Sequence, residues 1–292
     1  MVNTKVRLCG IELDNPIIPA SGTFGFGYEF AELYDINILG SLSFKGTTKE
    51  PRFGNPTPRI AECTAGMINS VGLQNPGVEK VLTEELPKLK GCFSKPVMAN
   101  VSGFSIDEYV CTVKKLDPEP QIGWFEINIS CPNVKEGGIA FGQDPKAVEA
   151  ITKAVKAKAK QPVIMKLSPN VTDITEMAKA AEAGGADVLS LINTLTGMKI
   201  DINRRSFVLA NKTGGMSGPA VHPVAVRMVY EAAHAVNIPI IGMGGITNAS
   251  DAIEMILAGA TAVSVGTANF VNPKTTEQIV DGIAEYMDKY GV

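Results

Sequence analysis

The stretch QPVIMKLSPNVTDITEMAKAAEAGGADVLSLINT, residues 161–194, contains two short apolar runs separated by a helical pattern. The runs at 161–170 and 186–194 place apolar residues on consecutive positions, which is typical of strands buried on both faces. The segment 172–183 between them repeats apolar residues at helical spacing. This order predicts one parallel strand–helix–strand unit.

The same order repeats along the chain. Apolar runs predict strands at 15–21, 37–46, 95–103, 123–130, 161–170, 186–194, 238–246 and 261–268. Helical patterns follow at 27–35, 77–89, 105–116, 144–159, 172–183, 222–235, 248–258 and 275–289. Eight such units in 292 residues favour an α/β fold of the (β/α)8 TIM-barrel type over an open doubly wound sheet.

Three further features complete the predicted architecture. The start KVRLCGIELDN (5–15) is expected to form a β-hairpin that plugs the bottom of the barrel. Long connections at 46–76 and 194–221 follow strand C-terminal ends, where barrels of this kind build active sites. Because no linker or low-complexity segment interrupts the pattern, residues 1–292 are expected to form a single domain.

The composition excludes several classes of function. A net charge of −3 gives no basic surface for nucleic acid or an anionic membrane. No apolar run reaches the about 18 residues of a membrane span, and the N-terminus lacks the apolar core of a signal peptide. The five cysteines are widely spaced without a C-x-x-C pair, so we expect a cytoplasmic protein with no iron–sulfur cluster or zinc in this chain.

Polar and glycine residues gather where the predicted strands end, which indicates one shared ligand site. They are Ser21, Lys45, Asn100, Asn128, Lys166, Asn193, Thr194, Gly244, Gly245, Gly266 and Thr267. The turns GMGGI (242–246) and VGTA (265–268) follow the last two strands, where barrels commonly bind phosphate through backbone N–H groups. Tight turns without a ligand are the alternative interpretation.

Lys45 and Lys166 end two predicted strands in apolar surroundings (LSFKG and VIMKLS). A buried ammonium group is costly unless an anion pairs with it. An anionic cofactor or substrate suits both lysines, while a structural salt bridge or a Schiff-base role remains open for each.

Four asparagines, Asn69, Asn128, Asn133 and Asn193, supply uncharged donors and acceptors that suit a flat heterocycle. Any one of them taken alone is better explained as a turn or cap residue, whereas the set of four is much harder to explain in that way. Cys131 lies among them and has three interpretations: nucleophile, general base or inert packing. No histidine motif accompanies it, and a thiol whose free pKa is about 8.5 is able to act as a base near neutral pH.

Ten motifs spread along the whole chain resemble those of the dihydroorotate dehydrogenase family. They are PASGTFGFGYEF, SFKGTT, NSVGLQNPG, MANVSG, INISCPNVKEGG, KLSPN, NTLTGMKID, NKTGGMSGPAVHPVAVRMV, GMGGI and VGTA. The resemblance is greatest to the flavin-bearing catalytic subunit of the NAD-linked, two-subunit class.

The resemblance implies oxidation of dihydroorotate to orotate in pyrimidine (UMP) biosynthesis. Cys131 would take the proton from C5 while a hydride passes from C6 to N5 of FMN, with Lys45 and Lys166 as further catalytic residues. Implied FMN contacts are Ser21, Lys45, Gly46, Asn100, Asn128, Lys166, Ile192, Gly218, Gly244, Gly245, Gly266 and Thr267. Implied substrate contacts are Lys45, Asn69, Ser70, Val71, Gly72, Leu73, Asn128, Asn133, Asn193 and Thr194.

The resemblance also implies a partner subunit that carries FAD and a [2Fe–2S] cluster and passes the electrons to NAD⁺. The assembly would be a heterotetramer, in which each chain of a homodimer core holds one partner. The loop 130–142 would close over the substrate, with Gly137 and Gly138 as hinges. Three alternatives stay open: a fumarate-linked homodimer, a flavin-free phosphosugar or aldolase barrel, and a non-catalytic subunit that binds FMN for assembly.

Overall fold

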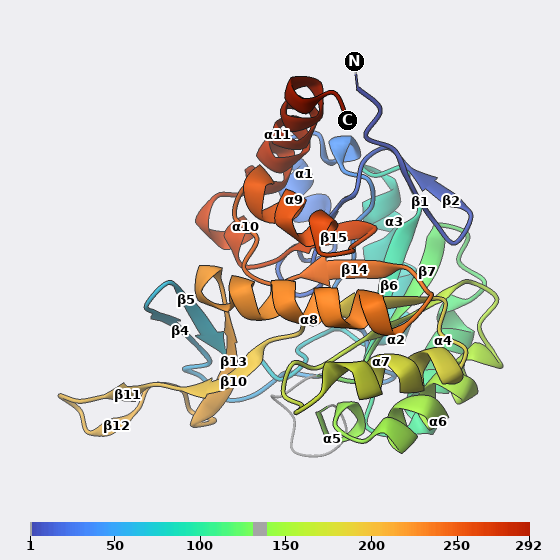
Figure 1. Ribbon diagram of the computed structural model, residues 1–292. Coiled ribbons are helices and arrows are strands. Elements are labelled where there is room, and N and C mark those ends of the chain that lie inside the picture. Colours follow the sequence, from blue (N-terminus) through green and yellow to red (C-terminus); the bar gives the residue numbers. More distant parts are fainter. Residues whose placement is uncertain (1, 131–138) are drawn as a thin grey trace.

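The computed structural model describes residues 2–130 and 139–292 of the chain. At its centre lies a parallel sheet in the order β3-β15-β14-β9-β8-β7-β6 (Figure 1). The strands are β3 (Ile17–Pro19), β6 (Val97–Val101), β7 (Ile122–Asn128), β8 (Val163–Lys166), β9 (Val188–Leu191), β14 (Ile240–Met243) and β15 (Ala262–Val265). Each coincides with one of the strands that the sequence predicts.

The prediction of a regular strand at 37–46 is wrong. The structure has a 3₁₀ helix, η1 (Ile36–Ile38), followed by an extended segment with only isolated bridges to β6. This segment still closes the barrel, because Ser43 N donates to Pro19 O of β3 (3.1 Å) while Met98 N of β6 donates to Leu42 O (2.9 Å). It therefore occupies the eighth position between the two edge strands.

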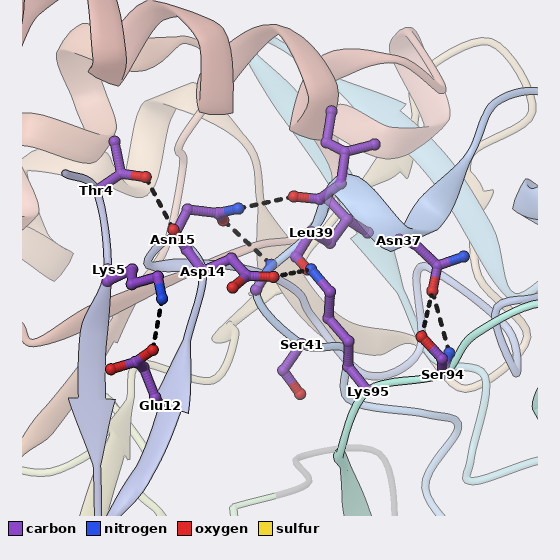
Figure 2. A network of polar contacts seen from close by, with 12 residues as sticks. Thr4, Lys5, Glu12, Asp14, Asn15, Asn37, Leu39, Ser41, Ser94 and Lys95 are labelled. Atoms are coloured by element: carbon purple, nitrogen blue, oxygen red, sulfur yellow. Dashed lines mark hydrogen bonds and ion pairs between the residues drawn. The ribbon is translucent and has the colours of Figure 1, made fainter. Parts of the chain in front are cut away.

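Side chains at the bottom of the barrel take over part of the hydrogen bonding in this segment (Figure 2). The Asn15 side chain donates to Ile38 O (2.7 Å) and accepts from Gly40 N (3.1 Å). Lys95, just before β6, donates to Leu39 O (2.7 Å) and pairs with Asp14 (2.7 Å). These contacts satisfy backbone groups that a regular strand ladder would otherwise pair, which explains why the ladder is incomplete here.

Helices cover the outside of the sheet, as predicted (Figure 1). The long ones are α4 (Ile106–Leu116), α6 (Pro145–Lys156), α7 (Ile174–Ala183), α8 (His222–Ala235), α9 (Ala249–Leu257) and α11 (Thr275–Tyr290). Shorter ones are α1 (Tyr28–Ala31), α5 (Ile139–Gly142), α10 (Ala268–Val271) and the 3₁₀ helix η3 (Pro219–Val221). None of the described helices is long and apolar enough to cross a membrane.

The predicted helix at 77–89 runs through its late proline. It consists of α2 (Val78–Lys80), a π-helical turn η2 (Val81–Glu85) and α3 (Leu86–Lys90). Pro87 directly follows the π-helical turn, which interrupts the regular α-helical hydrogen bonding ahead of it.

The bottom of the barrel is closed by a hairpin of β1 (Val6–Leu8) and β2 (Ile11–Leu13), as predicted. Leu8 and Leu13 are buried in one apolar cluster with Trp124 and residues from six further strands. The hairpin therefore plugs the barrel and leaves only its opposite end open to ligands.

The two long connections contain strands of their own, which the sequence did not predict. They contribute β4 (Ile60–Cys63), β5 (Gly66–Asn69), β10 (Leu195–Met198) and β13 (Thr213–Ser217) to an antiparallel sheet in the order β10-β13-β5-β4. A hairpin of β11 (Ile200–Asp201) and β12 (Ser206–Phe207) projects from the body beside it (Figure 1). The pairing of β5 with β13 joins segments about 150 residues apart, which no local pattern indicates.

Candidate active site

The alternation of side chains along each strand decides which residues face the inside of the barrel. Along β7, Phe125 and Ile127 pack in the outer cluster beneath the helices. Trp124, Glu126 and Asn128 therefore point to the inside, since successive side chains in a strand face opposite sides. Trp124 lies in the apolar layer at the bottom, Glu126 in the middle, and Asn128 lines a cavity at the mouth.

This cavity brings together all the residues that the resemblance assigns to FMN. Its lining includes Ser21, Lys45, Gly46, Asn100, Asn128, Lys166, Ile192, Gly218, Gly244, Gly245, Gly266 and Thr267. These residues come from every strand position around the barrel, so only closure of the sheet makes them neighbours. Their individual roles remain predictions.

Most of the predicted substrate contacts lie in the same lining, namely Asn69, Val71, Gly72, Leu73, Asn193 and Thr194. Ser70 is fully buried and is not part of the lining. Cys131, Asn133 and the proposed hinges Gly137 and Gly138 lie outside the described residues.

Lys166 stands at the end of β8 with its side chain only 7 % exposed. Its Nζ lies 4.0 Å from a carboxylate oxygen of Glu126, whose side chain is 3 % exposed. The structural salt bridge that the sequence left open for this lysine is therefore present. Lys166 also lines the cavity, so it is able to contact a ligand while it is paired with Glu126.

Glu126 is held by three hydrogen bonds besides this ion pair. Ser43 Oγ (2.9 Å) and Asn100 Nδ2 (2.6 Å) donate to one carboxylate oxygen, and Ser190 Oγ (2.8 Å) donates to the other. Burial by itself would raise the pKa of Glu126, but the Lys166 charge and these hydrogen bonds outweigh it and lower the pKa below its ordinary value. The carboxylate is therefore charged at neutral pH.

Asn100, which lines the cavity, carries a buried acceptor without a hydrogen-bond partner among the described residues. Its Nδ2 is used by Glu126, while its Oδ1 is buried and finds no hydrogen-bond partner among the described residues. A buried carbonyl oxygen without a partner is costly, so a ligand N–H is the group that would satisfy it.

The other asparagines form a cluster at the end of β7. Asn193 Nδ2 donates to Ser130 Oγ (2.7 Å), and Ser130 Oγ lies 3.0 Å from Asn128 Oδ1. Asn128 is anchored further through its backbone oxygen, which accepts from Tyr109 (2.8 Å). These contacts hold the amides of two strands side by side and do not cap a helix.

The turns after β14 and β15 form the opposite wall of the cavity. Gly245 adopts φ +70°, and a Cβ placed on it would lie 2.8 Å from both Gly218 O and His222 N. Glycine is therefore required where the backbone approaches so closely. That the N–H groups of this turn bind a phosphate remains a prediction from the sequence.

His222 supports this turn, which sequence reasoning missed. As predicted, α8 begins at this residue. The ring also lies with Nδ1 2.8 Å from Gly244 O and Nε2 3.1 Å from the Glu254 carboxylate. Because a carbonyl oxygen only accepts, Nδ1 must carry the proton and donate to Gly244.

Several lining residues also escaped the sequence analysis, among them Thr23, Met67, Met216, Ser217, Ile246 and Phe270. Met67 and Met216 lie on paired strands of the antiparallel sheet, which the sequence did not predict. Ser217 belongs to the quoted motif NKTGGMSGPAVHPVAVRMV, and its hydroxyl contacts that of Thr267 (2.7 Å). For Ser217 this motif was the available signal, as PASGTFGFGYEF was for Thr23 and GMGGI for Ile246.

The donor set of the cavity fits FMN. The buried oxygen of Asn100 would accept from the one N–H of an oxidised flavin ring, and the glycine turns would bind the phosphate. Lys45 and Lys166 are the charged residues in the described lining, and both are cations. This charge suits an anionic cofactor and an anionic substrate.

Comparison with known proteins agrees with this fit. The family model described as dihydroorotate dehydrogenase matches residues 3–287. A Lachnoclostridium phytofermentans protein named dihydroorotate dehydrogenase B (NAD(+)), catalytic subunit, is 61% identical over 99% of this chain and 95% of its own. A Bacillus pumilus protein of the same name is 57% identical, covering 98% of this chain and 92% of that protein.

The fold has a counterpart among solved structures. The crystal structure of a dihydroorotate dehydrogenase from Eimeria tenella in complex with ferulenol superposes with a TM-score of 0.80. It is 22% identical and covers 99% of this chain and 85% of the other. At this identity the likeness concerns the barrel fold alone.

Proposed function

The chain belongs to the dihydroorotate dehydrogenase family, and we propose that it oxidises dihydroorotate to orotate as the FMN-bearing catalytic subunit of an NAD⁺-linked enzyme. The observation that carries this proposal is the single cavity at the barrel mouth. It joins a buried acceptor, two cations, an asparagine cluster and two glycine turns in one lining. This step would belong to pyrimidine biosynthesis.

FMN would be held at both of its ends. Gly244, Gly245, Gly266 and Thr267 would bind the phosphate, and Asn100 would accept from the ring. When bound, FMN supplies the acceptor for a hydride and stores two electrons. The Lys166 ammonium group would stabilise the negative charge that develops on the reduced ring.

Dihydroorotate would lie over the ring, near the asparagine cluster. Asn69, Asn128 and Asn193 would hydrogen-bond its amide and imide groups, and the Lys45 cation would bind its carboxylate. Cys131 would remove the proton from C5. Cys131 is the residue after Ser130, and the Ser130 hydroxyl is hydrogen-bonded to both Asn128 and Asn193.

The stored electrons must leave through a partner, for which we propose a subunit that carries FAD and a [2Fe–2S] cluster. The relatives' name, catalytic subunit, is consistent with a second subunit. At the rim of the cavity, Phe270 lines the site and is 56% exposed, and the adjacent Val271 is 85% exposed. An apolar rim beside a redox site suits a partner that must approach the cofactor.

The core of the assembly would be a homodimer in a cytoplasmic heterotetramer. The β11/β12 hairpin projects from the body (Figure 1). It exposes Ile200, Ile202 and Phe207, of which Ile202 is 82% exposed. Exposed apolar side chains on one projecting hairpin favour contact with a second copy of the chain. Sedimentation of the isolated chain tests this, and a monomer at micromolar concentration would exclude the homodimer.

The proposed activity is tested by anaerobic titration of the FMN-loaded chain with dihydroorotate, followed by NAD⁺ or fumarate. We expect the oxidised flavin absorption to bleach with dihydroorotate and to recover with neither acceptor until the partner subunit is added. Rapid recovery with fumarate would instead identify the fumarate-linked homodimer. An unchanged flavin spectrum would rule out dihydroorotate as the substrate.

The same experiment separates the remaining alternatives. A non-catalytic FMN-binding subunit would retain the cofactor without bleaching. A flavin-free barrel would bind no FMN. The Schiff-base role of Lys166 that such an aldolase could use is not favoured, because an ammonium group paired with a buried carboxylate is a poor nucleophile.

A further inference from the structure

We propose that Glu126 is a positioning residue of the flavin site: it keeps Lys166 as a charged ammonium group at the base of the cavity and fixes the direction of the Asn100 amide. Glu126 does not line the cavity and belongs to none of the predicted contacts. The inference rests on the proposed FMN site and concerns what lies directly beneath it.

The first observation is that both oxygens of the Glu126 carboxylate accept hydrogen bonds. Its two oxygens receive hydrogen bonds from three strand positions of the barrel, those of Ser43, Asn100 and Ser190. A charged carboxylate only accepts hydrogen bonds, so all three neighbours must donate. The carboxylate thus imposes one direction on every polar group around it.

This direction matters most for Asn100. An asparagine amide has a donor end and an acceptor end, and the donor end, Nδ2, lies 2.6 Å from Glu126. The acceptor end, Oδ1, must therefore face away from Glu126, where it is buried without a partner among the described residues. Glu126 in this way fixes Oδ1 as the end of the Asn100 amide that is left for a ligand N–H.

The second observation is the charge balance. The described lining of the cavity carries the cations Lys45 and Lys166, and its other described members are uncharged. Glu126 lies beneath this lining, 4.0 Å from Lys166 Nζ. Removing one partner of a buried ion pair leaves an uncompensated charge, which is strongly unfavourable. Without Glu126, the buried Lys166 side chain would lack its anionic partner beneath the cavity.

A merely structural role of Glu126 predicts a different effect of its replacement. If Glu126 only filled the core, its replacement by an isosteric amide would change stability but not the electronic properties of the flavin. Glu126→Gln is suitable because Gln keeps the shape and one acceptor oxygen, while the hydroxyl of Ser190 is able to turn and accept from the new amide. The substitution therefore removes mainly the charge.

The first experiment measures the thermal stability of the apo-protein for wild type, Glu126→Gln, Lys166→Met and the double variant. We expect Glu126→Gln to melt below the double variant, because only the single variant leaves a buried ammonium group unpaired. This result does not depend on FMN. Equal melting temperatures of Glu126→Gln and the double variant would overturn the proposed role of the ion pair. A Glu126→Gln protein that fails to fold, beside a double variant that folds, would support it.

The second experiment measures the midpoint potential of bound FMN in the same four proteins under anaerobic conditions. Glu126→Gln is expected to bind reduced FMN at least about tenfold less favourably relative to oxidised FMN, which lowers the potential by about 30 mV. Lys166→Met should lower it similarly, and the double variant should add no further loss. Ser190→Ala, which removes one hydrogen bond but keeps the charge, is the control and should stay near wild type.

The proposal is overturned if Glu126→Gln leaves the potential unchanged or raises it, if its effect adds to that of Lys166→Met, or if Lys166→Met has no effect. Failure of the proposed function looks different, because the wild-type chain would then either bind no FMN or bind FMN that dihydroorotate does not bleach. The wild-type control therefore separates the two.

Discussion

Replacing Gly245 by alanine tests the phosphate turn most directly. Gly245 lies at φ +70°, and an alanine there pays about 1–2 kcal/mol for the left-handed conformation. The added Cβ would also come within 2.7 Å of His222 Cβ and 2.8 Å of Gly218 O and His222 N. Two of these three atoms belong to the backbone, so the turn itself must shift.

A shifted turn would lose hydrogen bonds to the phosphate. One bond to a charged group contributes about 1.5–3 kcal/mol, which corresponds to roughly 10- to 150-fold weaker binding. We therefore expect Gly245→Ala to raise the dissociation constant of FMN by at least about tenfold. Quenching of flavin fluorescence on titration into the apo-protein measures this constant.

Gly291 provides a matched control at the end of α11. It has nearly the same φ, +68°, but an added Cβ would meet nothing within 4 Å. Gly291→Ala should lower the stability by the conformational cost alone and leave FMN binding unchanged. FMN affinity within threefold of wild type in Gly245→Ala, or equal weakening in both variants, would refute the reasoning.

The remaining predictions address catalysis, charge and the partner. Cys131→Ala should keep FMN but lose about 10²–10⁴-fold of dihydroorotate oxidation, measured as the rate of flavin bleaching; full retention would remove Cys131 from the mechanism. Lys166→Ala should slow flavin reduction about 10²-fold more than it weakens dihydroorotate binding, and a normal rate in stopped flow would contradict this. The pKa of Glu126 is lowered in the folded state, so its stabilising effect is complete above about pH 4.5 and is lost as the pH falls through the folded pKa. Melting curves should therefore show wild type losing more stability than Glu126→Gln below pH 4.5, and parallel losses would argue against it. Val271→Asp should weaken binding of the partner subunit without changing bleaching. The control Leu257→Asp, at a residue that is 76% exposed at the C-terminal end of α9, should leave both partner binding and bleaching unchanged.

Local patterns predicted much of the barrel because each strand–helix unit carries its own signal. The helix at 222–235 begins and ends where predicted, since Pro223 in its first turn sets the start. The segment at 37–46 was misjudged because its apolar composition matches a strand, while part of its hydrogen bonding goes to side chains such as Asn15. Composition does not reveal which backbone groups are satisfied by distant side chains.

The candidate site was foreseen where residue type alone carries the chemistry. Lys45, Lys166 and the glycine turns stand out in sequence, because a lysine or a glycine pair at a strand end needs a reason. Glu126 does not stand out, since a charged residue alternating with Phe125 and Ile127 looks like the solvent-facing side of a half-buried strand. In the closed barrel that side is the interior.

By itself, the sequence determined the succession of strands and helices, the chemical types gathered at the strand ends and the family resemblance, because these depend on neighbours along the chain. Only the tertiary structure decided which face of β7 lies inside, how β5 pairs with β13, and that Glu126 meets Lys166. These depend on closure of the sheet, which places residues from distant strands within hydrogen-bonding distance. The direction of the Asn100 amide follows from the same closure, because it is set by a carboxylate on the neighbouring strand.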